Sequence, residues 1–285
     1  MRSSPRAIVT KNFTPMHKPA VLLLAVTLPL AAQWTSYRDP QTPRKKGQPD
    51  LTAPTPRTNG RPDFSGVWQA ERSPLSEIAN VLGSAFANLQ VDINDVGKYY
   101  INVFWGLKPD QEPLQPAAGP IMKQRAHLPD PTSRCLPAGV PGGLFIYAFK
   151  MIQTPRQIVV LPESGDPPRQ IYLDGRSLPV HPQPSWAGYS AGKWQGDTLV
   201  VETTGFTEDS WLDGFGHPRS ETMRITETYR RRDFGHADLE VNIEDAKYYT
   251  RPFSFKTQLD LVADSDVLEY ICAENEKDRA HLPHP

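Results

Sequence analysis

The sequence predicts a mainly β protein, an antiparallel β-barrel of about eight to nine strands with short accessory helices. Segments after residue 145 are rich in β-branched residues and alternate apolar with polar side chains, as half-buried strands do. Short turns separate these segments, and the strand–helix–strand rhythm of a parallel sheet is missing. Because closing many antiparallel strands into a ring removes exposed edges, we expect a barrel.

Composition narrows the possible partners. The chain has 285 residues, and its 31 Lys and Arg nearly balance its 32 Asp and Glu. Without a basic excess we expect no nucleic-acid partner. The 30 prolines and the hydrophobic fraction of 38% indicate that part of the chain is extended while the rest supplies the core.

The first residues have the pattern of a targeting segment. Basic residues precede an apolar run at 19–32, which is too short to cross a bilayer, since a spanning helix needs about 20 apolar residues. We therefore expect a signal peptide over 1–32, starting at Met1 or Met16, and a periplasmic or extracellular protein. A short membrane anchor is the alternative. After signal removal we expect no membrane span.

Composition also divides the remaining chain. Residues 33–62 are dominated by Pro, Thr, Arg, Lys and Gly, which predicts a flexible Pro-rich linker. Residues 63–285 form the predicted barrel domain. A helical insertion interrupts it at about 73–109, where a Ser-Pro pair suits a helix start. A second short helix is predicted over 117–125.

The strand signals follow one another in order. A hairpin turn is expected at 154–156, and the segment 222–231 alternates so that Glu227 shares a face with apolar neighbours. The predicted strands are 64–68, 146–153, 157–161, 170–173, 198–203, 222–231, 239–243, 253–261 and 267–271.

Two cysteines, Cys135 and Cys272, remain after the targeting segment. An even count in an oxidising compartment predicts a disulfide between them, and two unpaired buried thiols are the alternative. No cluster of Cys and His has the spacing of a zinc site, so we expect no metal and no cofactor.

Several motifs resemble known proteins. The segment 64–68 resembles the Gly-x-Trp signature that opens lipocalin-like barrels. Longer blocks are similar to a family of secreted bacterial proteins without an established activity, so the resemblance implies export and a lipocalin-like barrel but no reaction. This chain has Leu178 and Tyr189 where that family often has His. The blocks are Cys135–Pro141, Ile171–Arg176, Gly192–Thr203, Trp211–Asp213, Tyr229–Arg231, Asp233–His236 and Cys272–Glu276.

Three residues are candidates for acid–base catalysis. His217 and Asp213 lie in a Gly-rich loop, where a carboxylate can orient a histidine that acts as a general base. An ordinary polar turn is the alternative for that loop. Glu227 would face the barrel interior, either as a functional acid or in an ion pair with a cation such as Arg176. Ser190 lies in a Gly-x-Ser-x-Gly sequence, but the strand and helix that a nucleophile elbow requires are not predicted around it.

A further set could bind a ligand through aromatic surfaces and one charged pair, with core packing as the alternative. It comprises Asp174, Arg176, Trp186, Tyr189, Trp194, Trp211 and Tyr229.

Three functions follow from this sequence. The first is binding of a small, partly apolar molecule inside the barrel. The second is a cofactor-independent isomerase, lyase or hydrolase with acid–base residues at the barrel mouth. The third is a structural module of the envelope with a filled core. The sequence predicts neither the ligand nor the oligomeric state.

Overall fold

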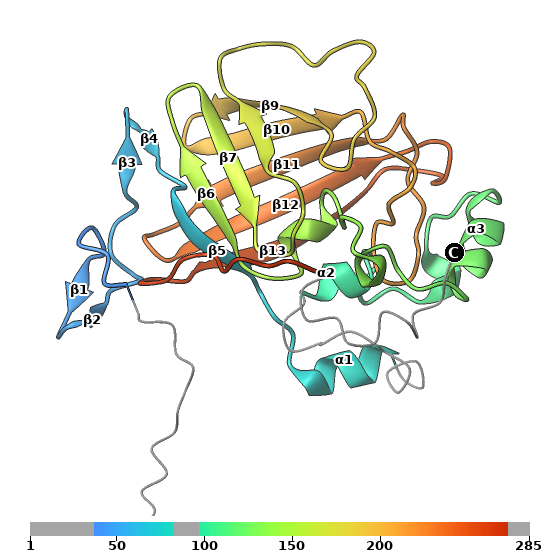
Figure 1. Ribbon diagram of the computed structural model, residues 1–285, viewed down its shortest axis with the longest axis horizontal. Helices are drawn as coiled ribbons and strands as arrows, with labels where there is room; N and C mark the ends of the chain where they lie inside the picture. Colours follow the sequence, from blue (N-terminus) through green and yellow to red (C-terminus); the bar gives the residue numbers. More distant parts are fainter. Residues whose placement is uncertain (1–36, 83–96, 273–285) are drawn as a thin grey trace, which may run out of the picture. The chain divides into compact units, whose positions relative to one another are not determined.

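The computed structural model describes residues 37–82 and 97–272, and it shows a mainly β fold with short helices around a closed nine-stranded barrel (Figure 1). The strands follow one another around the ring in chain order, and the last strand pairs with the first. The predicted signal peptide 1–32 lies outside the described residues. The barrel strands are β5 (Gly66–Ala70), β6 (Phe149–Gln153), β7 (Gln157–Pro162), β8 (Arg169–Tyr172), β9 (Tyr189–Gln195), β10 (Thr198–Thr204), β11 (Arg224–Arg231), β12 (His236–Glu244) and β13 (Phe253–Leu261).

The helices are short and lie between β5 and β6 in the chain. The predicted helix at 117–125 is confirmed as α3, whereas the helix that begins after Ser73 is described only to residue 82. None of the described helices has the length and apolar character needed to cross a membrane. The α-helices are α1 (Leu75–Leu82), α2 (Lys98–Ile101) and α3 (Ala118–Arg125), and the 3-10 helices are η2 (Pro109–Gln111), η3 (Thr132–Arg134) and η4 (Gly142–Leu144).

One barrel pair, β8 with β9, is parallel, and the other pairs are antiparallel. An odd number of strands cannot alternate in direction all the way around a ring, so one parallel pair is unavoidable. The connection 173–188 returns the chain to the other end of the barrel, as a parallel pair requires. β9 is missing from the predicted strands because its glycine hides the alternation. A Cβ at Gly192 would lie 2.8 Å from Leu173 Cδ2.

The alternation predicted for the later strands is confirmed. In β11 the side chains of Ile225, Glu227 and Tyr229 are buried, whereas Thr226 and Thr228 between them are partly exposed. The paired strands β12 and β13 continue the same inner face, which forms the apolar core of the barrel. Their buried apolar residues are Ala237, Leu239, Val241, Ile243, Phe253, Phe255, Leu259 and Leu261.

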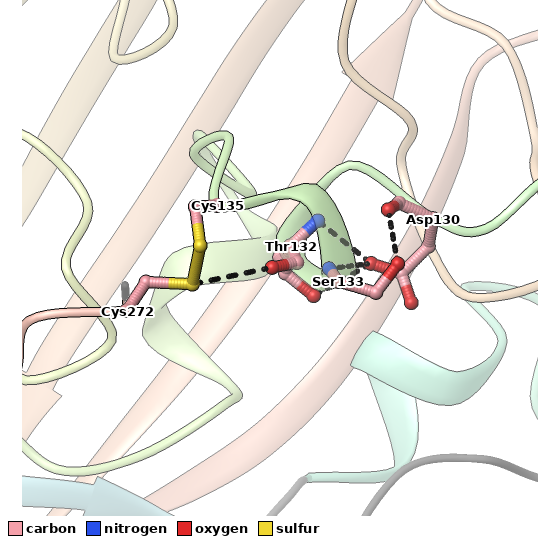
Figure 2. Close-up of a disulfide and its surroundings, with 5 residues drawn as sticks. All are labelled: Asp130, Thr132, Ser133, Cys135 and Cys272. Atoms are coloured by element: carbon pink, nitrogen blue, oxygen red, sulfur yellow. Dashed lines mark hydrogen bonds between the residues drawn. A yellow bond between two sulfur atoms is a disulfide. The ribbon is translucent and has the colours of Figure 1, made fainter. Parts of the chain in front are cut away.

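The predicted strand at 267–271 does not form. The end of β13 from which this segment continues is already paired on both edges, with β12 and with β5, so no edge is free there for a further strand. This segment leads instead to Cys272, which is bonded to Cys135 as predicted, with a Cα–Cα distance of 5.5 Å and a sequence separation of 137 (Figure 2). The side chain of Asp130 holds the adjacent η3 turn by accepting from Thr132 N at 2.7 Å.

Residues 37–62 differ from the expected flexible linker, because they form two short hairpins. The turn at Asn59 and Gly60 has positive φ at both residues, 52° and 75°, which is the geometry that an Asn-Gly pair favours in a two-residue hairpin. Arg57 forms an ion pair with Asp197, and Arg61 donates to the carbonyl of Gly196 at 2.7 Å. The hairpin strands are β1 (Arg44–Lys45), β2 (Gln48–Pro49), β3 (Arg57–Thr58) and β4 (Arg61–Pro62).

The insertion completes one rim of the barrel. β13 pairs with β5 only over Leu259–Leu261, so the first half of β13 has no strand beside it on that edge. Aromatic side chains from the insertion take the place of a strand. The ring of Tyr99 stacks on Phe255 with centroids 4.1 Å apart, and Phe104 packs on Phe253 at 4.5 Å.

Candidate functional site

The loop between β10 and β11, residues 205–223, brings His217 and Asp213 together as the sequence suggests. The Nδ1 atom of His217 lies 2.6 Å from Asp213 Oδ2, and both side chains are buried. Asp213 also accepts hydrogen bonds from the backbone N–H groups of Val103 at 2.8 Å and Phe215 at 3.0 Å. The carboxylate therefore fixes its own loop and joins it to the insertion.

A second carboxylate, which the sequence analysis does not include, closes the other side of the ring. His217 Nε2 lies 3.2 Å from Glu112 Oε2, on the segment that follows η2. Burial disfavours the charged ring, but Asp213 and Glu112 outweigh this effect and raise the pKa of His217 to about 9. At neutral pH both ring nitrogens therefore donate to carboxylates. Without a free lone pair, His217 cannot act as a general base in this arrangement.

Arg219 anchors the same loop from within. Its buried guanidinium donates to the backbone carbonyls of Thr207 at 2.9 Å and Val140 at 3.0 Å. Burial lowers the pKa of Arg219, although a guanidinium stays protonated in proteins. The charge is thus satisfied by carbonyl dipoles, which ties the loop to the segment before η4.

Glu227 faces the barrel interior, as predicted, but its cation is Arg169 rather than Arg176. Arg169 donates to Glu227 through both Nη atoms, at 2.9 Å for the Oε1 contact, and neither side chain is more than 2% exposed. The Tyr229 hydroxyl donates to Glu227 at 2.8 Å, and burial together with that carboxylate raises the pKa of Tyr229 well above its usual value. Ser190 accepts from Arg169 Nε at 3.0 Å, so this serine belongs to the same network.

This interior network and the His217 cluster share no residue, so the three proposed acid–base groups do not form one site. The buried carboxylates of Asp213 and Glu227 are already paired, with His217 and Arg169 respectively. Within the described part of the chain, no three His, Cys, Asp or Glu side chains are arranged to hold a metal ion.

The predicted ligand-binding residues do not converge either. Arg176 lies at the surface, pairs with Asp174 at 2.6 Å and donates to the Tyr189 hydroxyl at 3.1 Å. Trp194 packs on Phe64 with centroids 6.2 Å apart, near the second hairpin. The other three members of the set are elsewhere: Trp186 is partly buried beside the Arg219 guanidinium, Trp211 is buried beside Arg125, and Tyr229 is in the interior network.

A pocket of about 370 Å³, here called the rim pocket, opens where the insertion meets the first half of β13. Five of its lining residues are aromatic, and three others carry polar side chains. The amide oxygen of Asn242 is buried and has no hydrogen-bond partner among the described residues. The aromatic residues are Tyr99, Phe104, Trp105, Phe253 and Phe255, and the polar residues are Asn242, Arg251 and Ser254.

The walls of the rim pocket are held by contacts behind them. The Trp105 indole donates to Glu77 at 2.9 Å, which fixes the plane of that ring. Phe104 meets the edge of His217 with centroids 5.0 Å apart, so the His217 cluster supports one wall. Sequence reasoning missed this pocket because it assigned the insertion no function. The available signal was the density of aromatic residues over 99–105.

Compared with known proteins, this chain matches no family model, no curated protein and no solved structure.

Proposed function

We propose that this protein is exported and binds a small, partly apolar molecule in the rim pocket. The observation that carries the proposal is a cavity of about 370 Å³ with aromatic walls and a buried, unpartnered amide oxygen on Asn242. Small-molecule sites combine volumes of roughly 300–1,000 Å³ with mainly apolar walls and a few polar groups.

The rim pocket replaces the barrel interior as the place for a ligand. Trp68, Phe149 and Tyr229 fill the interior and are fully buried, and the ion pair of Arg169 with Glu227 lies among such side chains. Binding is also favoured over acid–base catalysis, because both nitrogens of His217 are engaged by carboxylates.

Export is supported by the disulfide, since disulfides persist in oxidising compartments. The test is to express the full chain in a bacterial host, fractionate the cells and measure the intact mass of the product. We expect a chain that begins near residue 33, carries the disulfide and is found outside the cytoplasm. A full-length cytoplasmic product with free thiols would contradict the proposal.

Binding can be tested with N-phenyl-1-naphthylamine, a neutral aromatic probe whose fluorescence rises in apolar sites. Ser254 lines the rim pocket and is exposed, so Ser254→Phe should fill the space and abolish the signal. Gln258→Phe adds the same ring farther along the outer face of β13 and should leave the signal unchanged. Equal signals from the two variants, or no signal from the unmodified protein, would overturn the proposal.

A further inference from the structure

We infer that the ligand of the rim pocket is an aromatic anion that carries an N–H or O–H donor, with Arg251 holding the anionic group and Asn242 accepting from the donor. This inference rests on the proposed function and adds the chemical class of the ligand. It follows from three features of the pocket: an unpaired cation, an unpaired acceptor and flat walls.

Arg251 supplies the cation. It is exposed at the edge of the rim pocket, in the connection between β12 and β13, and no ion pair to it exists among residues 37–82 and 97–272. The lysines on either side of it in the sequence are paired: Lys247 with Glu208 at 2.5 Å and Lys256 with Glu240 at 3.3 Å. A planar guanidinium without a partner suits a carboxylate or sulfonate, which it can bind through two parallel hydrogen bonds.

Asn242 supplies the acceptor. Its side chain leaves the outer face of β12 beside Ser254, and its Oδ1 atom is buried without a donor in the described structure. Leaving such an atom unsatisfied destabilises a fold, so buried polar groups normally have partners. A donor on a ligand in the rim pocket would satisfy this oxygen. Arg251 and Asn242 together therefore require a ligand that carries both an anionic group and a hydrogen-bond donor.

The aromatic residues that line the rim pocket determine the shape of the rest of the ligand. The stacked pair of Tyr99 and Phe255 and the contact of Phe104 with Phe253 line the rim pocket with rings that are packed from behind, and the three phenylalanines are largely buried. Rings of this kind favour an offset or edge-on approach by another aromatic group. The volume of about 370 Å³ accommodates a compound of a few fused or linked rings.

Two probes that differ in one group test the inference. 8-Anilinonaphthalene-1-sulfonate and N-phenyl-1-naphthylamine share their rings and their N–H, but only the first carries an anion. We expect the sulfonate to bind about tenfold more tightly at low salt, as one charge-assisted contact predicts. Arg251→Gln should remove that advantage and leave the neutral probe unchanged. Asn242→Leu should weaken both probes alike, because both present the N–H.

Arg230→Gln is the matched control, since it makes the same charge change at an exposed position of β11 outside the rim pocket. Circular dichroism and thermal melting are used to check that each variant is folded. If both probes bind equally and Arg251→Gln changes neither, the inferred ligand class is wrong while the pocket stands. If neither probe binds, or Ser254→Phe blocks neither, the proposed function fails instead.

Discussion

Inside the barrel the Arg169 guanidinium donates to Glu227, Ser190 and Thr203, whereas at the rim the amide oxygen of Asn242 finds no donor among the described residues. Both regions bury polar atoms. The interior satisfies them within the chain, which stabilises one packing arrangement, whereas at the rim the Asn242 oxygen is available to the ligand that we propose. A buried charge by itself therefore does not indicate a binding site, and the unmet hydrogen-bonding group beside the rim pocket is the better basis for the proposed one.

The strongest test of this comparison is Arg169→Met. It leaves the Glu227 carboxylate buried without its cation, which should lower the free energy of unfolding by about 3–5 kcal/mol. Urea denaturation measures the loss. Arg156→Met is the control, because Arg156 is 82% exposed and lies 3.8 Å from Asp174, so its removal should cost less than about 1 kcal/mol. Equal losses for the two variants would show that the interior network is not structural.

The next largest effect concerns the pH dependence that His217 imposes. Its folded pKa of about 9 lies above the ordinary value of 6.5, so its contribution is complete below pH 6.5 and is lost as pH rises through 9. The shift corresponds to about 3 kcal/mol. Burial holds the pKa of the nearby Tyr249 well above this range.

The measurement is the free energy of unfolding at pH 6 and pH 9.5 for the unmodified protein and for His217→Gln. The advantage of the unmodified protein should shrink by about 3 kcal/mol between the two conditions. His236→Gln is the control, since His236 is partly exposed beside Asp233 at a hairpin turn. A difference between the unmodified protein and His217→Gln that does not change with pH would contradict the assigned charge.

The smallest effect on stability is expected at the rim. Asn242→Leu removes an acceptor that has no partner, so the free energy of unfolding should stay within about 1 kcal/mol of the original or rise. Probe binding should nevertheless weaken. A loss of stability above about 2 kcal/mol would show that Asn242 has a structural role, and the contrast between interior and rim would disappear.

Local patterns predicted much of the barrel. The alternation in β11 placed Glu227 inside, and an even cysteine count predicted the disulfide. The same patterns gave wrong strand assignments where contacts with other parts of the chain determine whether a segment forms a strand. Glycine concealed β9, and the segment at 267–271 looks like a strand but follows an end of β13 that is already paired on both edges.

The candidate sites were less accessible to sequence reasoning. His217 and Asp213 are four residues apart, so their proximity could be anticipated. Glu112 is 105 residues from His217, and Arg169 is 58 residues from Glu227. Separations of this size contain no periodicity that relates the two residues, so the partners appear only when the chain is folded.

Within the strands that alternate clearly, the amino-acid pattern shows which residues share a face, because the two-residue period of a strand fixes the face of every side chain once one is known. The pairing of the charges and the position of the rim pocket follow from the folded chain. Those outcomes depend on how the insertion packs against the unpaired half of β13, and packing between distant segments is set by three-dimensional shape rather than by spacing along the chain.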